Sequence, residues 1–308
     1  MISGLDPAKE QFLASLTDLQ SRVSNAEQQL TTGLRVNQAS DAPQALGDIF
    51  QTRADLGQQN QFIQNLTSVQ AQTQAADSSI QSTIQLMQQA ISLGTEGASS
   101  TTNASQDQQL AAQVQGIQAQ IVTLSRTQMA GVYIFSGDQP GSPAYQVNTS
   151  SPTGVDRLIT TQATQQIQDP TGVKFQAAMT AQDLFDKRDS SDNPTPQNVF
   201  AGLNGLTLAL QSGDSNSVST ALGSLQTAYA YLNQQLGFYG AVENRITTSL
   251  DLANKFQLQD QTKLSSLQDA DIPAETLALT QATTGLNAAM AAEAQRPRTT
   301  LFDFLPIG

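Results

Sequence analysis

Residues 30–43 separate two segments with helical patterns, and they predict where the first helix ends and the second begins. Their sequence is Leu-Thr-Thr-Gly-Leu-Arg-Val-Asn-Gln-Ala-Ser-Asp-Ala-Pro. Gly33 predicts the end of the first helix, because glycine adopts a left-handed cap at no steric cost. Asp41 predicts the N-cap of the next helix, with Pro43 in its first turn, where the missing N–H of proline does no harm. Arg35 and Asp41 are either a contact pair or ordinary surface charges.

The segment before this break has the pattern of a helix that needs a partner. Between residues 8 and 32 the spacing of apolar residues alternates between four and three, as in a heptad seam. These positions are Phe12, Leu16, Leu19, Val23, Ala26 and Leu30. Because the seam is narrow and an isolated helix is marginal in water, we expect this helix to be mobile in the monomer and to order against a partner helix.

The segment after the break predicts long helices that fold back on each other. Helical spacing continues after the break at Leu46, Ile49, Phe50, Ala54 and Leu56. The longest periodic run then predicts a helix over residues 58–93, ended by Gly94 and Gly97. A second helix is expected from Leu110 to Met129. A Ser/Thr/Asn-rich loop joins the two helices, so they should lie antiparallel.

The pattern changes at residues 131–137, Gly-Val-Tyr-Ile-Phe-Ser-Gly, an aromatic and β-branched run between glycines that predicts a strand. Gly, Pro, Asp, Asn and Thr are frequent from there to about residue 190, which predicts a small, mainly β insertion. Its expected elements are strands at Tyr145–Val147 and Leu158–Thr161, a pairing segment at Val173–Phe175 and a short helix at Ala181–Phe185.

Helical spacing returns near residue 199 and predicts a last long helix over residues 216–267, which Gly237 and Gly240 could bend. Asp271 and Pro273 then repeat the acidic cap and proline of the first break. Since both chain ends carry a weak helix, a break and a long helix, we expect the ends to pair. The predicted fold is mainly α with a β insertion: long antiparallel helices or a coiled coil formed by both chain ends, and a small β-rich domain inserted at the tip.

This pattern divides the chain into five segments. We expect assembly helices, mobile in the monomer, at both ends, two halves of a helical rod between them, and a β-rich insertion between the two halves. The segments are an N-terminal assembly helix (1–40), the first part of the rod (41–130), the insertion (131–194), the second part of the rod (195–268) and a C-terminal assembly helix (269–308).

Composition excludes several classes of function. The 308 residues carry a formal net charge of -12, which disfavours binding to nucleic acid and to anionic membranes. Cys and His are absent, so thiolate sites, disulfides and imidazole ligands or bases are excluded. We expect no enzyme activity, no metal and no cofactor. The N-terminus lacks the pattern of a cleaved secretory signal, and no apolar run approaches membrane-spanning length.

Two groups of residues could carry chemistry, but simpler interpretations are stronger. Acidic residues recur every third position at Asp183, Asp186, Asp189 and Asp192. They could bind calcium weakly, but a solvated loop is the expected structure. Tyr133 and Phe135 could form a binding platform, but we expect them to be part of a β core.

Three stretches together resemble the flagellin superfamily, and within it most closely the hook–filament junction proteins. They are LTTGLRVNQASDAPQAL at residues 30–46, GVYIFSG at 131–137 and LFDFL at 301–305. Leu34 is typical of flagellins, whereas junction proteins more often have Lys there. Flagellin, the filament subunit, therefore stays the alternative.

The resemblance implies a structural subunit that joins hook to filament by self-assembly through its terminal helices. The implied partners are copies of itself in a ring, a neighbouring hook-associated protein, flagellin and an export chaperone. The implied location is the extracellular flagellum, reached by type III export without a cleaved signal. The residues expected at assembly interfaces are Phe12, Leu16, Leu19, Val23, Leu30, Gly33, Arg35, Asn37, Asp41, Leu286, Met290, Leu301, Phe302, Phe304 and Leu305.

A different class of protein also fits the helical pattern. A soluble coiled-coil interaction protein, such as a type III translocator component, would form no ordered polymer and would not affect motility. An enzyme is the weakest interpretation, because no catalytic constellation is visible.

Overall fold

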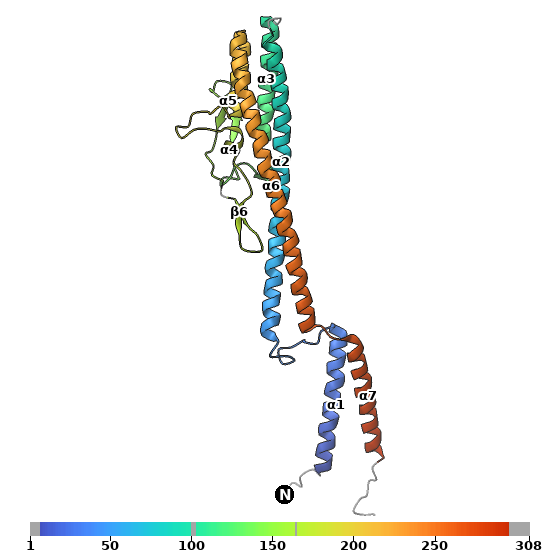
Figure 1. Cartoon of the computed structure of the whole chain (residues 1–308). Coiled ribbons are helices and arrows are strands. Elements are labelled where there is room, and N and C mark those ends of the chain that lie inside the picture. Colours follow the sequence, from blue (N-terminus) through green and yellow to red (C-terminus); the bar gives the residue numbers. More distant parts are fainter. Residues whose placement is uncertain (1–6, 100–102, 164, 296–308) are drawn as a thin grey trace, which may run out of the picture. The chain divides into compact units, whose positions relative to one another are not determined.

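A computed structural model describes residues 7–99, 103–163 and 165–295. In this part of the chain seven helices carry most of the residues, and the strands are short (Figure 1). The helices are α1 (Pro7–Thr32), α2 (Leu46–Gly97), α3 (Ala104–Leu124), α4 (Ala181–Phe185), α5 (Val199–Ser212), α6 (Ser215–Gln268) and α7 (Ile272–Ala294). None of the described helices has the length and apolar character needed to cross a membrane.

The strands pair as three separate antiparallel hairpins. They are β1 (Gln128–Met129) with β2 (Val132–Tyr133), β3 (Tyr145–Val147) with β4 (Val155–Arg157), and β5 (Gln166–Gln168) with β6 (Lys174–Gln176). The registers place Met129 opposite Val132, Gln146 opposite Asp156 and Ile167 opposite Phe175. A mainly α fold with a β insertion is therefore confirmed.

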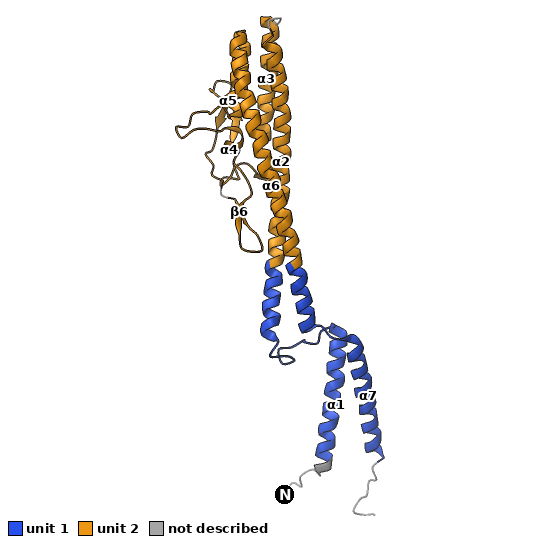
Figure 2. Ribbon diagram, in the orientation of Figure 1, with its two compact units in different colours: residues 1–58, 256–308 blue, residues 59–255 orange. Residues whose placement is uncertain are grey.

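The chain divides into two compact units (Figure 2). Unit 1 contains residues 1–58 and 256–308, and unit 2 contains residues 59–255. Helices α2 and α6 each contribute residues to both units.

In unit 2, parts of α2 and α6 pack with α3 and α5 around one apolar core. Its fully buried side chains include Ile80, Met87, Ile121, Leu203, Leu206 and Leu232. Helix α2 ends at Gly97, close to the predicted end. A Cβ added to Gly97 would lie 2.2 Å from Leu210 Cδ2, so this glycine lets α2 and α5 approach closely.

The hairpins of unit 2 lie beside its helices. Gln118 of α3 donates a hydrogen bond to the Thr153 carbonyl at 2.7 Å, which attaches the turn between β3 and β4. The Tyr145 ring of β3 packs against Phe200 of α5 with ring centroids 5.0 Å apart. The β-rich segment therefore lies along the side of the unit 2 helices (Figure 1), whereas the sequence prediction placed it at the tip.

The third hairpin packs on α2 and α6. Ile167 and Phe175 form a small apolar cluster with Leu66, Val242 and Ile246. The Arg245 guanidinium lies 4.2 Å from the centre of the Phe175 ring and adds a cation–π contact.

Several predicted boundaries are wrong. The predicted strand at residues 131–137 is a strand only at Val132–Tyr133, because Phe135 enters the helical core. The strand expected at Leu158–Thr161 lies instead at Val155–Arg157. Helix α2 runs without a break from Leu46 to Gly97, so the helical spacing that begins at Leu46 and the helix predicted over residues 58–93 belong to one helix.

Candidate functional site

The two terminal helices of unit 1, α1 and α7, pack antiparallel. Leu19 of α1 faces Gly285 of α7, where an added Cβ would lie 3.3 Å from Leu19 Cδ2. Beyond the helix ends, Leu34 forms an antiparallel β-bridge with Asp269. The expected pairing of the two chain ends through antiparallel helices is therefore confirmed.

The apolar seam of this pair is only partly covered. Of the apolar side chains on the described parts of α1 and α7, only those of Ala26 and Ala282 are buried. The interface residues predicted on the two helices are partly buried, except for Met290, which is 58% exposed. The partly buried ones are Phe12, Leu16, Leu19, Val23, Leu30 and Leu286. Two small buried residues make a thin core, so these helices retain apolar surface for another partner.

Unit 1 also exposes several large apolar side chains. Although it is the smaller unit, it holds six of the eleven exposed large apolar side chains of the described chain. They are Leu13, Phe50, Leu258, Ile272, Leu277 and Met290. Single exposed apolar residues are common, but a concentration in one unit indicates an interaction surface.

Of these six residues, only Met290 is among the interface residues predicted from the sequence. The helical spacing included both Ile49 and Phe50, but Ile49 is buried and Phe50 is 63% exposed. Adjacent apolar residues on a helix point about 100° apart, so both cannot face the same core. The paired residues Ile49–Phe50 and Phe12–Leu13 were the available signal.

Gly33 ends α1 as predicted. Its φ of +71° is left-handed, and its N–H donates to the Gln29 carbonyl at 2.8 Å. The segment after it pairs with the end of α6: Arg35 N–H donates to the Gln268 carbonyl at 2.7 Å, and Ala270 N–H donates to the Gly33 carbonyl at 2.9 Å. The two breaks in the chain therefore form one hydrogen-bonded junction.

Asp41 does not cap α2. Its carboxylate accepts hydrogen bonds from the backbone N–H groups of Asn37 and Gln38, at 2.8 and 2.7 Å, and so closes the loop that precedes it. Pro43 lies in a turn before α2 and not in its first turn. The expected N-cap at the second break is correct, because Asp271 accepts from Ala274 N–H at 3.2 Å and Pro273 lies at the start of α7.

Arg35 and Asp41 are not a contact pair. The Arg35 guanidinium donates to the Leu267 carbonyl at 2.8 Å, and the Asn37 amide donates to the Leu34 carbonyl at 2.7 Å. Of the predicted interface residues in this loop, Gly33, Arg35, Asn37 and Asp41 all make hydrogen bonds inside unit 1. They shape the junction that connects the breaks. Leu301, Phe302, Phe304 and Leu305 lie outside the described residues.

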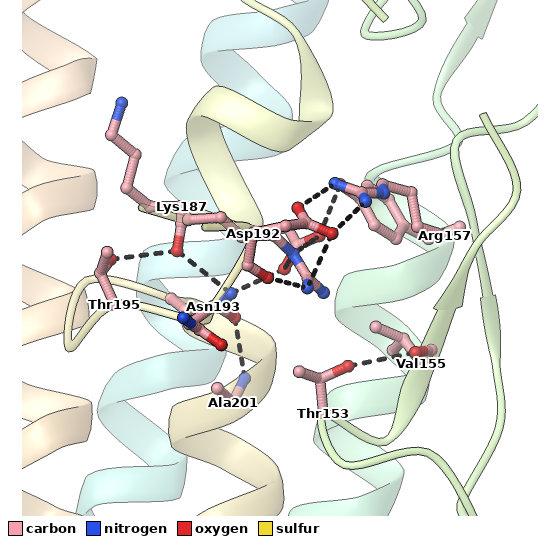
Figure 3. A network of polar contacts seen from close by, with 12 residues as sticks. Thr153, Val155, Arg157, Lys187, Asp192, Asn193, Thr195 and Ala201 are labelled. Atoms are coloured by element: carbon pink, nitrogen blue, oxygen red, sulfur yellow. Dashed lines mark hydrogen bonds and ion pairs between the residues drawn. The ribbon is translucent and has the colours of Figure 1, made fainter. Parts of the chain in front are cut away.

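The acidic residues of the loop between α4 and α5 belong to a network of polar contacts, in which Figure 3 shows Arg157 beside Asp192. Asp186 is fully buried, and accepts hydrogen bonds from Arg188 Nε at 2.9 Å, Asn198 Nδ2 at 2.6 Å and the Tyr145 hydroxyl at 3.1 Å. The solvated loop predicted for this segment is therefore wrong for Asp186. Burial, followed by the nearby Asp186 charge, raises the pKa of Tyr145.

Arg188 links two of these carboxylates, because its guanidinium also lies 3.7 Å from a carboxylate oxygen of Asp192. Arg157 binds Asp192 through two hydrogen bonds, at 2.9 and 2.6 Å, and Asp189 accepts from Ser191 and Asn193 N–H groups, both at 2.9 Å. In the described part of the chain, no group of three or more His, Cys, Asp or Glu residues could hold a metal ion. This network attaches the 186–195 loop to the β3–β4 hairpin.

The comparison with protein families finds a match in the N-terminal part of the chain. Residues 8–139 match the family described as the bacterial flagellin N-terminal helical region. This part of the chain is therefore similar to the helical region of flagellins, and the resemblance to the flagellin superfamily is confirmed. A search of curated protein sequences finds no match.

Solved structures with the same fold are described as flagellar hook-associated proteins or FlgL. A protein from Vibrio parahaemolyticus, described as a flagellar hook-associated protein, is 15% identical with a TM-score of 0.64, over 74% of this chain and 100% of its own. Bacillus cereus FlgL is 18% identical with a TM-score of 0.54, over 72% and 100%. Hook-associated protein-3 from Legionella pneumophila is 11% identical with a TM-score of 0.60, over 71% and 98%. At these identities the likeness concerns the fold.

Proposed function

We propose that this chain is a structural subunit of the bacterial flagellum that joins the hook to the filament and assembles through its terminal helices. The observation that carries the proposal is the incompletely covered α1–α7 pair in a chain with a flagellin-type N-terminal region. The names of the solved structures with this fold support the junction role over that of the filament subunit.

The proposed partners follow from the same surface. Copies of this chain would pack side by side in a ring, so that the apolar residues of α1 and α7 become covered. A hook-associated protein would lie on one side of the ring and flagellin on the other, and a chaperone would cover the terminal segments before export. The net charge of -12 argues against nucleic acid and anionic membranes as partners.

The predicted segment boundaries and interface residues belong to this proposal. In it, the terminal segments 1–40 and 269–308 are mobile in the free subunit and become ordered on docking. The apolar interface residues on α1 and α7 contact neighbouring subunits, whereas Gly33, Arg35, Asn37 and Asp41 hold the junction in shape. The chain acts as a structural part and has no catalytic role.

Flagellin itself is the alternative, and electron microscopy separates the two. Purified protein is offered isolated hooks in one tube and flagellin seeds in another. We expect a short cap confined to hook ends and no growth on the seeds. Long filaments on the seeds would make the chain a flagellin, and attachment to neither would favour a coiled-coil protein outside the flagellum.

A further inference from the structure

Two adjoining cavities in unit 2 lie beside β2, in the motif that sequence analysis singled out at residues 131–137. The outer cavity has a volume of about 310 Å³ and the inner one about 10 Å³. Gln72, Ile134, Gln165 and Ala178 line both, so the inner cavity continues the outer one. The motif therefore has two roles: Phe135 is core, and Tyr133 lines the outer cavity.

One of the residues that line the inner cavity, Thr73, has a buried hydroxyl group without a partner. Thr73 is 2% exposed, and its Oγ1 has no hydrogen-bond partner among the described residues. Other threonines of α2 donate to the carbonyl four residues earlier, as Thr83 does to Ser79 at 2.8 Å. A buried hydroxyl without a partner is unfavourable, so the Thr73 hydroxyl is available to a group that enters the inner cavity.

The volume of the inner cavity limits what this group can be. A space of about 10 Å³ accommodates one water at most. A water there would bond to Thr73 Oγ1 and offer its remaining hydrogen bonds toward the outer cavity. Through such a water, Thr73 would contact an occupant of the outer cavity.

The wall of the outer cavity is built by specific contacts. Gly137 has a φ of +51°, and an added Cβ would lie 2.4 Å from the Gln162 carbonyl oxygen, so the chain turns there only with glycine. Gln165 Nε2 donates to Gln72 Oε1 at 3.0 Å and so fixes both amides where the cavities meet. The polar groups are thus held in place before any occupant arrives.

The lining defines the chemistry of the occupant. Among the described residues that line the cavities none is charged, so a charged occupant would lack a partner. Val132, Pro140 and Met179 provide an apolar surface, and Gln72, Gln165 and Tyr133 provide amide and hydroxyl groups. We infer that the outer cavity binds a neutral ring that carries several hydroxyl groups and has the size of one sugar.

This inference does not depend on the proposed role in the flagellum, and binding to the full chain tests it. The probes are methyl α-D-glucopyranoside and cyclohexanol, which has a ring of the same size but one hydroxyl group. We expect saturable chemical-shift changes for the glucoside, at Gln72 and Gln165, and weaker changes for cyclohexanol. No saturable change with the glucoside up to its solubility limit would overturn the inference.

Three variants locate the binding. Thr73→Val removes the unpartnered hydroxyl and should weaken glucoside binding about tenfold. Thr83→Val removes a satisfied buried hydroxyl on the same helix and should leave binding unchanged. Val132→Trp should block the outer cavity from a position that is 40% exposed, where the fold tolerates a larger side chain. Binding that survives Val132→Trp, or equal binding of both probes with no effect of Thr73→Val, would overturn the inference.

Discussion

Gly33 sets the direction of the chain where α1 ends, and its effect can be measured at one residue. Gly33→Ala forces a left-handed backbone on a residue with a Cβ, which should lower the local stability of unit 1 by about 1–2 kcal/mol. Amide hydrogen exchange in the junction measures this change. Because nothing lies within 4 Å of the added Cβ, the effect would be one of backbone strain.

Gly116 offers the matched control. It lies inside α3 and also has open space around an added Cβ. Its backbone is helical, so Gly116→Ala should stabilise α3 by up to about 1 kcal/mol. Equal protection of the junction amides in Gly33→Ala and in the unaltered protein would contradict the account of the cap.

Asp192 should show a measurable pH dependence. Hydrogen bonds from Arg157 lower the pKa of this carboxyl below its ordinary value. A lowered pKa in the folded state means that the ionised form stabilises the fold. This stability is present above the unfolded value of about 3.9 and is lost as the pH falls through the folded value. An NMR titration of the carboxyl groups should give Asp192 a pKa below about 3.9, and the Arg157→Leu substitution should raise this pKa toward that value. An ordinary pKa for Asp192 in the unaltered protein would contradict its pairing with Arg157.

At the scale of elements, periodicity predicted most helices because their apolar residues face one core along their length. The helix predicted at 216–267 is observed at Ser215–Gln268, and Ala181–Phe185 matches as predicted. Boundaries that depend on tertiary contacts were missed. Asp41 closes its own loop because the amides of Asn37 and Gln38 lie within its reach, and no local pattern separates this arrangement from an N-cap.

The short strands were harder to predict than the helices. Each hairpin has only two or three residues per strand, so side-chain packing on the helices decides its position. The buried Asp186 network joins residues up to 41 positions apart, and spacing along the sequence gave no sign of it. The apolar stripe of α1 was predictable, whereas the exposure of Phe50 required the structure.

The α1–α7 pair should be the least protected helical element in the free subunit. Its described apolar seam buries only Ala26 and Ala282, whereas α3 buries Leu110, Val114 and Ile121. Amide hydrogen exchange should therefore be fast in α1 and slow in α3. On docking to hook ends, α1 should gain protection. Strong protection of α1 in the free monomer would contradict the expectation that it needs a further partner.

At the scale of the whole molecule, the two units differ in how much apolar surface they cover. Unit 2 has an extended buried core, and unit 1 has the larger share of exposed large apolar side chains. This difference is the basis for assigning assembly to unit 1. A family match can name a class of protein, but the distribution of apolar surface indicates which residues should contact neighbouring subunits.

The central claim is that unit 1 provides the assembly surface, and one pair of variants tests it most directly. Met290 of unit 1 and Leu208 of unit 2 are equally accessible, at 58% and 57% exposed. Each is changed to Asp, and attachment to isolated hooks is counted by electron microscopy. The account predicts that Met290→Asp fails to attach and Leu208→Asp attaches like the unaltered protein. Normal attachment of Met290→Asp, or loss with Leu208→Asp alone, would contradict it.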